Sequence, residues 1–178
     1  MLFSVPKKQG FRTMDKIVRV YDERGTLFYF RNPDKFPFVF NLPRGKYQTT
    51  NSLTPCEPRR YKLPQLPKRE RKNKIPKNVK FVWGNNPHKA SIYIEKGLII
   101  FDFALKQLSL PQQRQVFYHE LGHYHYKTEA YCDLFSVRSM LKEGFNPSQC
   151  YYSINGTLND SPSSHYRKEF ILKNCENV

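Results

Sequence analysis

Three residues of one short segment, His119, Glu120 and His123, have the types and spacing of a hydrolytic metal site. They form an H-E-x-x-H motif in a segment predicted to be helical, residues 111–126. Residues four apart lie on one face of a helix, with Cβ atoms roughly 5 to 6 Å apart, so both imidazoles can bind one zinc ion at about 2.0 to 2.1 Å. Glu120 is placed to act as general base on a water that the metal activates. Gly122 is small enough to let a neighbouring helix approach closely.

A catalytic zinc site needs a third protein ligand, and the nearest candidates are His125, Glu129 and Asp133. In an unbroken helix, residue 129 would lie about 9 Å further along the axis than His123, out of reach of the metal. The chain is therefore expected to turn between residues 124 and 128. Thr128 can cap a second helix over residues 129–143, which puts Glu129 in the first turn and Asp133 one turn later on the same face.

Short strands and further helices are predicted around the motif. Residues 80–84 form one strand, and residues 91–95 and 98–103 form a hairpin around Gly97. The strand over 98–103 is next to the motif in the sequence and is a candidate for the edge strand that holds an extended substrate. A last helix is predicted over residues 163–173. These elements predict an α+β fold, in which a small sheet accompanies the metal-site helix and the helices that follow it.

The positive charge is confined to the first part of the chain. The 178 residues carry a formal net charge of +15, and residues 1–80 account for +14 of it, with 20 Lys+Arg against 6 Asp+Glu. Nine of the 13 prolines also lie there. With a β-hairpin predicted over residues 16–31, the sequence indicates a β-rich N-terminal extension over 1–53, a basic proline-rich linker or arm over 54–78, and a metal-site domain over 79–178.

The apolar content argues against membrane and secretory proteins. No apolar run approaches the roughly 20 residues that span a bilayer, and the N-terminus has too short an apolar stretch for a signal peptide. The four cysteines have no C-x-x-C spacing, which is typical of reduced, partly buried thiols. We therefore expect a cytoplasmic protein with no membrane partner.

The segment after the motif resembles a known class of enzymes. Glu129-Ala-Tyr-Cys-Asp133 matches the E-x-x-x-D element that follows H-E-x-x-H in gluzincin-type zinc metallopeptidases. The run HELGHYHYKTEAYCDLFSVRSML is similar to the core of small metallopeptidase-like proteins encoded by bacteriophages and mobile elements. The resemblance covers about residues 79–150 and implies a zincin-like fold with the zinc ligands His119, His123 and Glu129. Glu120 is then the general base, and Asp133 orients a ligand imidazole.

The spacing departs from the gluzincin pattern. Only five residues separate His123 from Glu129, as in metzincins, whereas thermolysin-like gluzincins have many more. Metzincins carry a glycine in this turn where the chain has Tyr126, and their third ligand is normally histidine. The ligand type thus resembles that of gluzincins and the spacing that of metzincins. Glu129 is the first candidate for the third ligand, and Asp133 and His125 are the alternatives.

The predicted function is zinc-dependent hydrolysis of a peptide bond in a peptide or protein substrate, with Glu120 as the base. Tyr126 and His165 are candidates to donate to the oxyanion of the transition state. The alternative is a structural or docking protein, for example a component of a phage particle, that retains a zincin fold. A phage-encoded protein of this kind would occur in the host cytoplasm and in the virion.

The arm supplies the candidate docking residues, which are Lys68, Arg69, Arg71, Lys72 and Lys74. A run of positive charges with few acidic residues attracts nucleic acid or an acidic partner, such as a phage structural protein. A charge run of this kind is also typical of a solvated linker.

Overall fold

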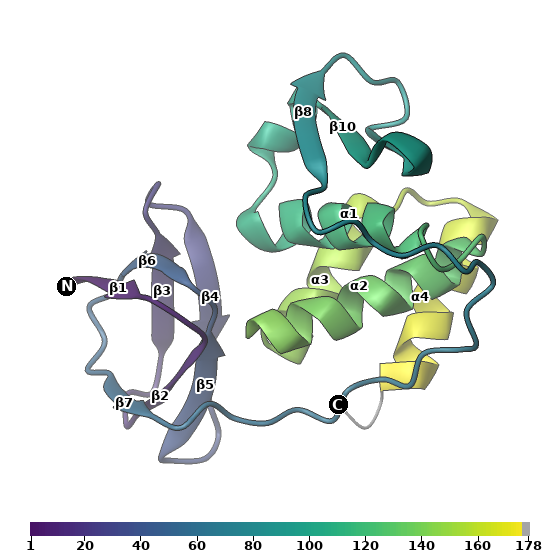
Figure 1. The fold of residues 1–178 in the computed structure, drawn as a ribbon. Helices are drawn as coiled ribbons and strands as arrows, with labels where there is room; N and C mark the ends of the chain where they lie inside the picture. Colours follow the sequence, from purple (N-terminus) through teal and green to yellow (C-terminus); the bar gives the residue numbers. More distant parts are fainter. Residues whose placement is uncertain (176–178) are drawn as a thin grey trace.

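The computed structural model describes residues 1–175, which form an α+β fold of ten strands in three small sheets and four α-helices. Figure 1 shows the N-terminal strands gathered at one end and the helices at the other, with the third sheet beside helix α1 (Leu110–Gly122). The predicted α+β class is confirmed. Within residues 1–175 no helix is both long and apolar enough to cross a membrane.

The N-terminal strands form two sheets, with the orders β1-β6-β3-β4 and β5-β2-β7. Their bounds are β1 (Leu2–Val5), β2 (Gln9–Thr13), β3 (Val18–Asp22), β4 (Leu27–Arg31), β5 (Phe38–Leu42), β6 (Gly45–Gln48) and β7 (Thr54–Cys56). The hairpin predicted over residues 16–31 is the antiparallel pair β3 and β4, and Gly25 has the positive φ of 76° that its turn requires. Alternation along β3 buries Val18 and Val20 and exposes Arg19, so one face of this sheet packs on the core.

The third sheet consists of β8 (Lys80–Gly84), β9 (Ala90–Tyr93) and β10 (Leu98–Asp102), in the order β8-β10-β9. β10 pairs with β8 in parallel and with β9 antiparallel, so it is the central strand. The expectation that residues 98–103 form the edge strand is therefore wrong, because the free edge on that side belongs to β9. Two short 3₁₀ helices, η1 (Ile94–Lys96) and η2 (Phe103–Gln107), flank β10.

Two helices carry the segment with the metal-site motif. α1 ends at Gly122, four residues before the predicted end, since the chain has already begun to turn. α2 (Glu129–Glu143) has the predicted bounds. It ends at Gly144, whose φ of 116° allows the left-handed cap and whose amide bonds back to the Met140 carbonyl.

Two helices complete the fold. α4 (Pro162–Cys175) extends slightly beyond the helix predicted over residues 163–173. α3 (Pro147–Thr157) was not predicted, although its start has the ordinary signals: Asn146 as the cap, Pro147 in the first turn and Gln149 completing a capping box.

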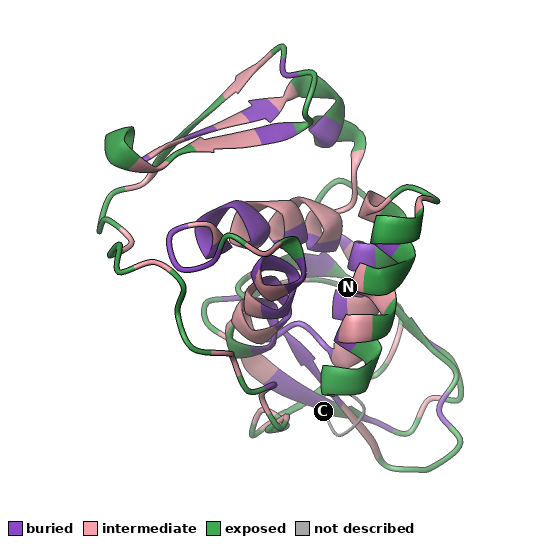
Figure 2. Ribbon diagram, turned by 90° about the vertical axis from the view of Figure 1, so that its right-hand side faces the viewer, coloured by how far each residue is buried: buried purple, intermediate pink, exposed green. Residues whose placement is uncertain are grey.

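The largest hydrophobic cluster joins the N-terminal strands to α2, α3 and α4 (Figure 2). The Phe28 ring lies 5.9 Å from the Phe145 ring, and the Asn146 amide donates to the Asn41 carbonyl at 3.0 Å. A second cluster fills the space between the third sheet and α1. The division into 1–53, 54–78 and 79–178 stays a prediction, and the first cluster shows that the N-terminal strands and the helices share a core.

Candidate metal centre

The first four residues of the H-E-x-x-H motif end α1, and His123 is the C-cap residue that follows the helix. The rings of His119 and His123 have centroids 5.1 Å apart, and their side chains are 11% and 19% exposed. A Cβ atom on Gly122 would come within 2.9 Å of the Cα atom of Cys132 on α2, which is closer than real contacts allow. Glycine at this position therefore permits the close approach of the two helices, as the sequence predicted.

The chain reverses between the two helices over residues 123–128, where a turn was expected. The amides of His123, Tyr124 and His125 each bond to the carbonyl three residues back, at 3.2, 3.2 and 2.8 Å, so the helix tightens into a 3₁₀-type turn and stops. α2 begins directly after the turn, with Glu129 as its first residue. This reversal brings Glu129 back over the end of α1, whereas a continuous helix would have carried it away.

Glu129 meets both histidines. One carboxylate oxygen lies 3.1 Å from His119 Nε2, and the other lies 3.6 Å from His123 Nε2. One ligand atom from each of the three residues lies within 4.8 Å of the others, and this is the metal-type group found in residues 1–175. Of the three candidates for a third ligand, Glu129 is the one that contacts both histidines through their Nε2 atoms.

The group fits the ligand set of a metal ion. Two ligands bound tetrahedrally at about 2.0 to 2.1 Å lie about 3.3 to 3.4 Å apart, close to the two carboxylate–imidazole distances. The three candidate ligands lie in the last turn of α1, at its C-cap and in the first turn of α2, and all three line a cleft. His119, His123 and Glu129 can therefore hold one metal ion and leave a position free for water or substrate.

Asp133 lies behind His119 and does not face the metal position. Its fully buried carboxylate is 2.7 Å from His119 Nδ1, so it fixes the ring with Nε2 toward the cleft. Arg167 of α4 donates two hydrogen bonds to the same carboxylate, from Nε to one oxygen at 2.6 Å and from Nη2 to the other at 2.8 Å. Arg167 Nη1 is also 3.6 Å from the Glu129 carboxylate. One arginine thus steadies both the residue behind the first ligand and the third ligand.

The ionisation of these groups follows from their contacts. Burial by itself raises the pKa of Asp133, but the hydrogen bonds from His119 and Arg167 outweigh it and hold the pKa below its ordinary value. Burial lowers the pKa of His119, whereas the bonds to Asp133 and Glu129 raise it. The bonds outweigh burial, and the pKa of His119 is raised to about 9. A metal ion must displace the proton from His119 Nε2, so metal binding at this site releases a proton.

Glu120 points into the same cleft. Burial raises the pKa of its carboxyl group, His119 opposes that effect and Glu129 adds to it. No other side chain or amide in residues 1–175 hydrogen-bonds to this carboxylate. A buried, unpartnered carboxylate next to a metal position is free to exchange a proton with a substrate or a water molecule.

The cleft has a volume of about 600 Å³ and surrounds the three candidate ligands. Strand β9 and the turn before it form one wall, the end of α3 forms another, and Arg71 of the arm lies at the rim. Since β9 is the edge strand on this side, an extended chain in the cleft would lie along a strand with free backbone groups.

Three other candidates lie outside the cleft. The Tyr126 hydroxyl donates to the Pro67 carbonyl at 3.3 Å, so it faces the arm. His165 is mostly exposed and contacts Asp160 at 2.9 Å. His125 is buried against the Phe135 ring, 5.7 Å away, and not among the residues that line the cleft. The structure therefore does not bring these side chains to the metal position.

The arm clasps the turn that precedes Glu129. The amides of Glu70 and Arg71 both donate to the His125 carbonyl at 2.9 Å. The Glu70 carboxylate accepts the amides of Lys127 and Thr128 at 2.6 and 3.1 Å, and these bonds lower its pKa. This clasp supplies acceptors and donors that a sharp turn between two helices would otherwise lack.

The five basic arm residues separate into two groups. Arg71 is partly buried, and its guanidinium donates to the His123 carbonyl at 3.1 Å beside the cleft. The exposed members are Lys68, Arg69, Lys72 and Lys74. No carboxylate within residues 1–175 forms an ion pair with these four, so their charges face solvent.

Replacing Glu70 with alanine should loosen the turn. We expect amide exchange at Lys127 and Thr128 to become about 2- to 10-fold faster, the factor for one lost hydrogen bond. The folded carboxyl group has a lowered pKa, so its contribution is complete above the ordinary value of 4.5 and is lost as the pH falls through the lower folded value. Exchange measured by NMR at about pH 6 tests this. Glu57→Ala is the matched control, because the exposed Glu57 carboxylate makes no hydrogen bond or ion pair within residues 1–175. Equal exchange in both variants would contradict the clasp.

Arg167, Glu70 and Arg71 were not assigned to the centre from the sequence. Arg167 lies 34 residues from Asp133, and Glu70 lies 58 residues from Thr128, so no local spacing connects them. Only the packing of α4 and the path of the arm bring them to the site.

Comparisons of the sequence with protein-family models and with curated proteins, and of the fold with solved structures, found no match. The chemistry of the centre therefore has to be inferred from its own residues.

Proposed function

We propose that the protein is a zinc-dependent peptide hydrolase with a zincin-like fold of the gluzincin type, as in small phage-encoded metallopeptidases. One observation carries the proposal: the donor atoms of His119, His123 and Glu129 lie within 4.8 Å of one another, and the unpartnered carboxylate of Glu120 lines the same cleft. Two imidazoles, one carboxylate and an open position are the ligand pattern of catalytic zinc. When bound, zinc would polarise the scissile carbonyl and make the attacking water more acidic.

The chain's own residues would carry the remaining steps. Glu120 accepts the proton of the attacking water and returns it to the leaving amine. Its buried position raises its pKa toward the range in which it can do both. Strand β9 offers backbone groups to an extended substrate, and Asp133 and Arg167 keep His119 and Glu129 oriented.

Metal analysis tests the proposal directly. Purified protein is expected to contain about one zinc ion per chain and to cleave an unstructured protein such as casein. A chelator should abolish cleavage and added zinc should restore it, while His119→Ala should lose both the metal and the activity. A wild-type chain that stays metal-free in excess zinc would overturn the proposal.

A docking role is the second candidate, in which the protein binds nucleic acid or an acidic protein, for example within a phage particle. The observation that favours it is the set of four exposed arm cations without an acidic partner. Such a role makes no demand on Glu120, which allows the two candidates to be separated by one substitution.

A further inference from the structure

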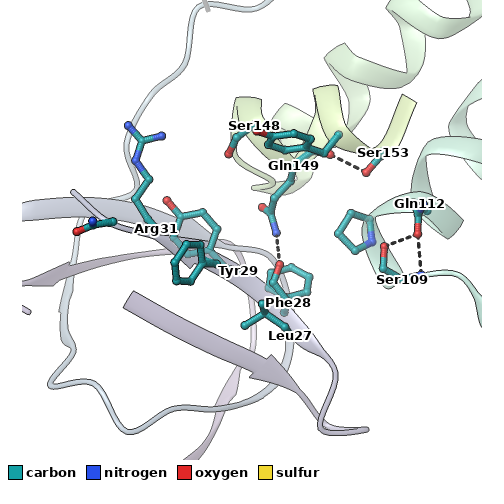
Figure 3. A pocket seen from close by; sticks show the side chains of 13 residues that line it. Leu27, Phe28, Tyr29, Arg31, Ser109, Gln112, Ser148, Gln149 and Ser153 are labelled. Atoms are coloured by element: carbon teal, nitrogen blue, oxygen red, sulfur yellow. Dashed lines mark hydrogen bonds between the residues drawn. The ribbon is translucent and has the colours of Figure 1, made fainter. Parts of the chain in front are cut away.

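A second groove, separate from the metal cleft, lies between strand β4 and the first turns of α1 and α3 (Figure 3). It has a volume of about 660 Å³ and shares no lining residue with the metal cleft. α1 borders both hollows, since Gln112 lines the groove and Gln115, one turn later, lines the cleft. Nothing in the proposed hydrolysis uses this groove.

One wall of the groove is a free strand edge. β4 is the last strand of the sheet β1-β6-β3-β4 and pairs with β3 alone. In that ladder Phe30 is opposite Arg19, whose amide and carbonyl are bonded to the side chains of Asn51 and Thr49 on the far side of β3. In an antiparallel pair, the backbone amides and carbonyls of two opposite residues either bond to each other or both point away from each other. The amide and carbonyl of Phe30 therefore point from the free edge of β4 toward the groove.

A neighbouring contact supports this orientation. Phe28, two residues earlier on β4, directs its carbonyl across the groove to the Gln149 side chain of α3, which donates at 2.8 Å (Figure 3). The amide and carbonyl of Phe30 have no partner of this kind in residues 1–175. At Phe30 the edge therefore offers one donor and one acceptor to an added strand.

The rim of the groove is apolar and exposed. Leu27 and Phe30 of β4 are 46% and 52% exposed, and Tyr152 of α3 is 70% exposed. Exposed apolar side chains grouped around a hollow are typical of a surface that receives the side chains of a partner. Side chains on one face of an added strand would contact this rim.

The charge of the groove selects an acidic partner. Arg31 is its charged lining residue and no acidic side chain lines it. The groove also receives the first turns of two helices, through Ser109 and Ser148, where the helix dipoles are positive. A second copy of this chain would be repelled, because residues 1–80 carry a net charge of +14.

We propose that the groove binds an extended, acidic peptide segment of a partner protein, which adds as a strand to the edge of β4. Main-chain hydrogen bonds to Phe30 supply the register, and the rim and the positive helix ends select alternating apolar and acidic side chains. The proposal goes beyond peptide hydrolysis, because it requires neither the metal nor Glu120.

Fluorescence anisotropy with a labelled peptide of five alternating Val-Glu pairs tests the proposal. Measurement in the Glu120→Gln background prevents hydrolysis from consuming the probe. We expect saturable binding that weakens with added salt, and much weaker binding of the corresponding Val-Lys peptide. Equal binding of the two peptides, or no saturation of the Val-Glu peptide up to about 1 mM, would overturn the proposal.

Two substitutions locate the binding. Phe30→Pro removes the free amide without costing a bond to β3, and Phe30→Ala, which keeps the amide, is its control. We expect the proline variant to bind about 2- to 10-fold more weakly than the alanine variant. Ser148→Asp puts a negative charge in the groove at a helix start that tolerates it, and it should weaken binding about 2- to 5-fold even if the proline variant fails to fold. Unchanged affinity in Ser148→Asp together with equal affinity in the two Phe30 variants would place the peptide elsewhere and refute the groove.

Discussion

Replacing Glu120 with glutamine is expected to slow peptide hydrolysis by about 10²- to 10⁴-fold while the bound metal stays in place. Glutamine has the size and shape of glutamate but cannot accept the proton of the attacking water. The candidate metal group consists of His119, His123 and Glu129, so the substitution removes no ligand. Initial rates on a fluorogenic peptide, measured together with the metal content of the same sample, test both parts of the expectation.

A matched control for this variant is Glu95→Gln. Glu95 is an exposed acid on η1, next to β9, and does not line the cleft. The Glu95→Gln substitution removes the same charge close to the site, so the activity of this variant should match that of the wild type. If Glu120→Gln retained full activity with its metal bound, Glu120 would not be the base and the proposed mechanism would fail.

The same variant separates hydrolysis from docking. A protein that serves by binding nucleic acid or an acidic partner through Lys68, Arg69, Lys72 and Lys74 should keep that binding when Glu120 is replaced. The docking role would be favoured if Glu120→Gln kept the partner binding of the wild type and its rate of hydrolysis were no lower than that of the wild type. Loss of hydrolysis with an intact fold and an intact metal would favour the enzyme.

Much of the metal centre could be predicted because its parts lie within 15 residues of one another. The spacing of His119 and His123 placed them on one helix face. At the rise of an α-helix, Glu129 would lie too far along the axis to reach them, so a turn before Glu129 was required. Gly122 was recognised as a point of close approach, and its Cβ position does collide with Cys132. Helical geometry is local, so it can be worked out from residue spacing alone.

The parts that escaped prediction depend on contacts between distant residues. α1 stops at Gly122 because the amides that follow it bond three residues back and because amides of the arm bond to the carbonyl of His125. Strands β1, β2, β6 and β7 have only three to five residues each, and pairing rather than sequence pattern defines them. The role of the arm was misjudged for the same reason: its composition is typical of a solvated linker, yet Glu70 and Arg71 use main-chain and side-chain bonds to hold the turn of the metal site.

Asp133→Ala is expected to destabilise the metal-free protein by about 3 to 5 kcal/mol. The Asp133 carboxylate is fully buried and bonds to both Arg167 and His119, so its removal leaves the largely buried Arg167 guanidinium without its main partner. Removing one member of a buried ion pair costs far more than the pair contributes, because the remaining charge loses its compensation. Urea unfolding in the presence of a chelator measures this effect without the added stability from metal binding.

The double variant Asp133→Ala with Arg167→Met distinguishes an unpaired charge from a simple loss of packing. Removing the guanidinium as well should recover most of the lost free energy of unfolding, since replacing both members of a buried pair by apolar side chains is often close to neutral. Metal affinity should remain about 10- to 100-fold weaker in both variants, because neither can orient His119 through Nδ1. If the double variant were less stable than Asp133→Ala alone, the cost would lie in the cavity, and the ion pair would not be what holds α4 against the metal centre.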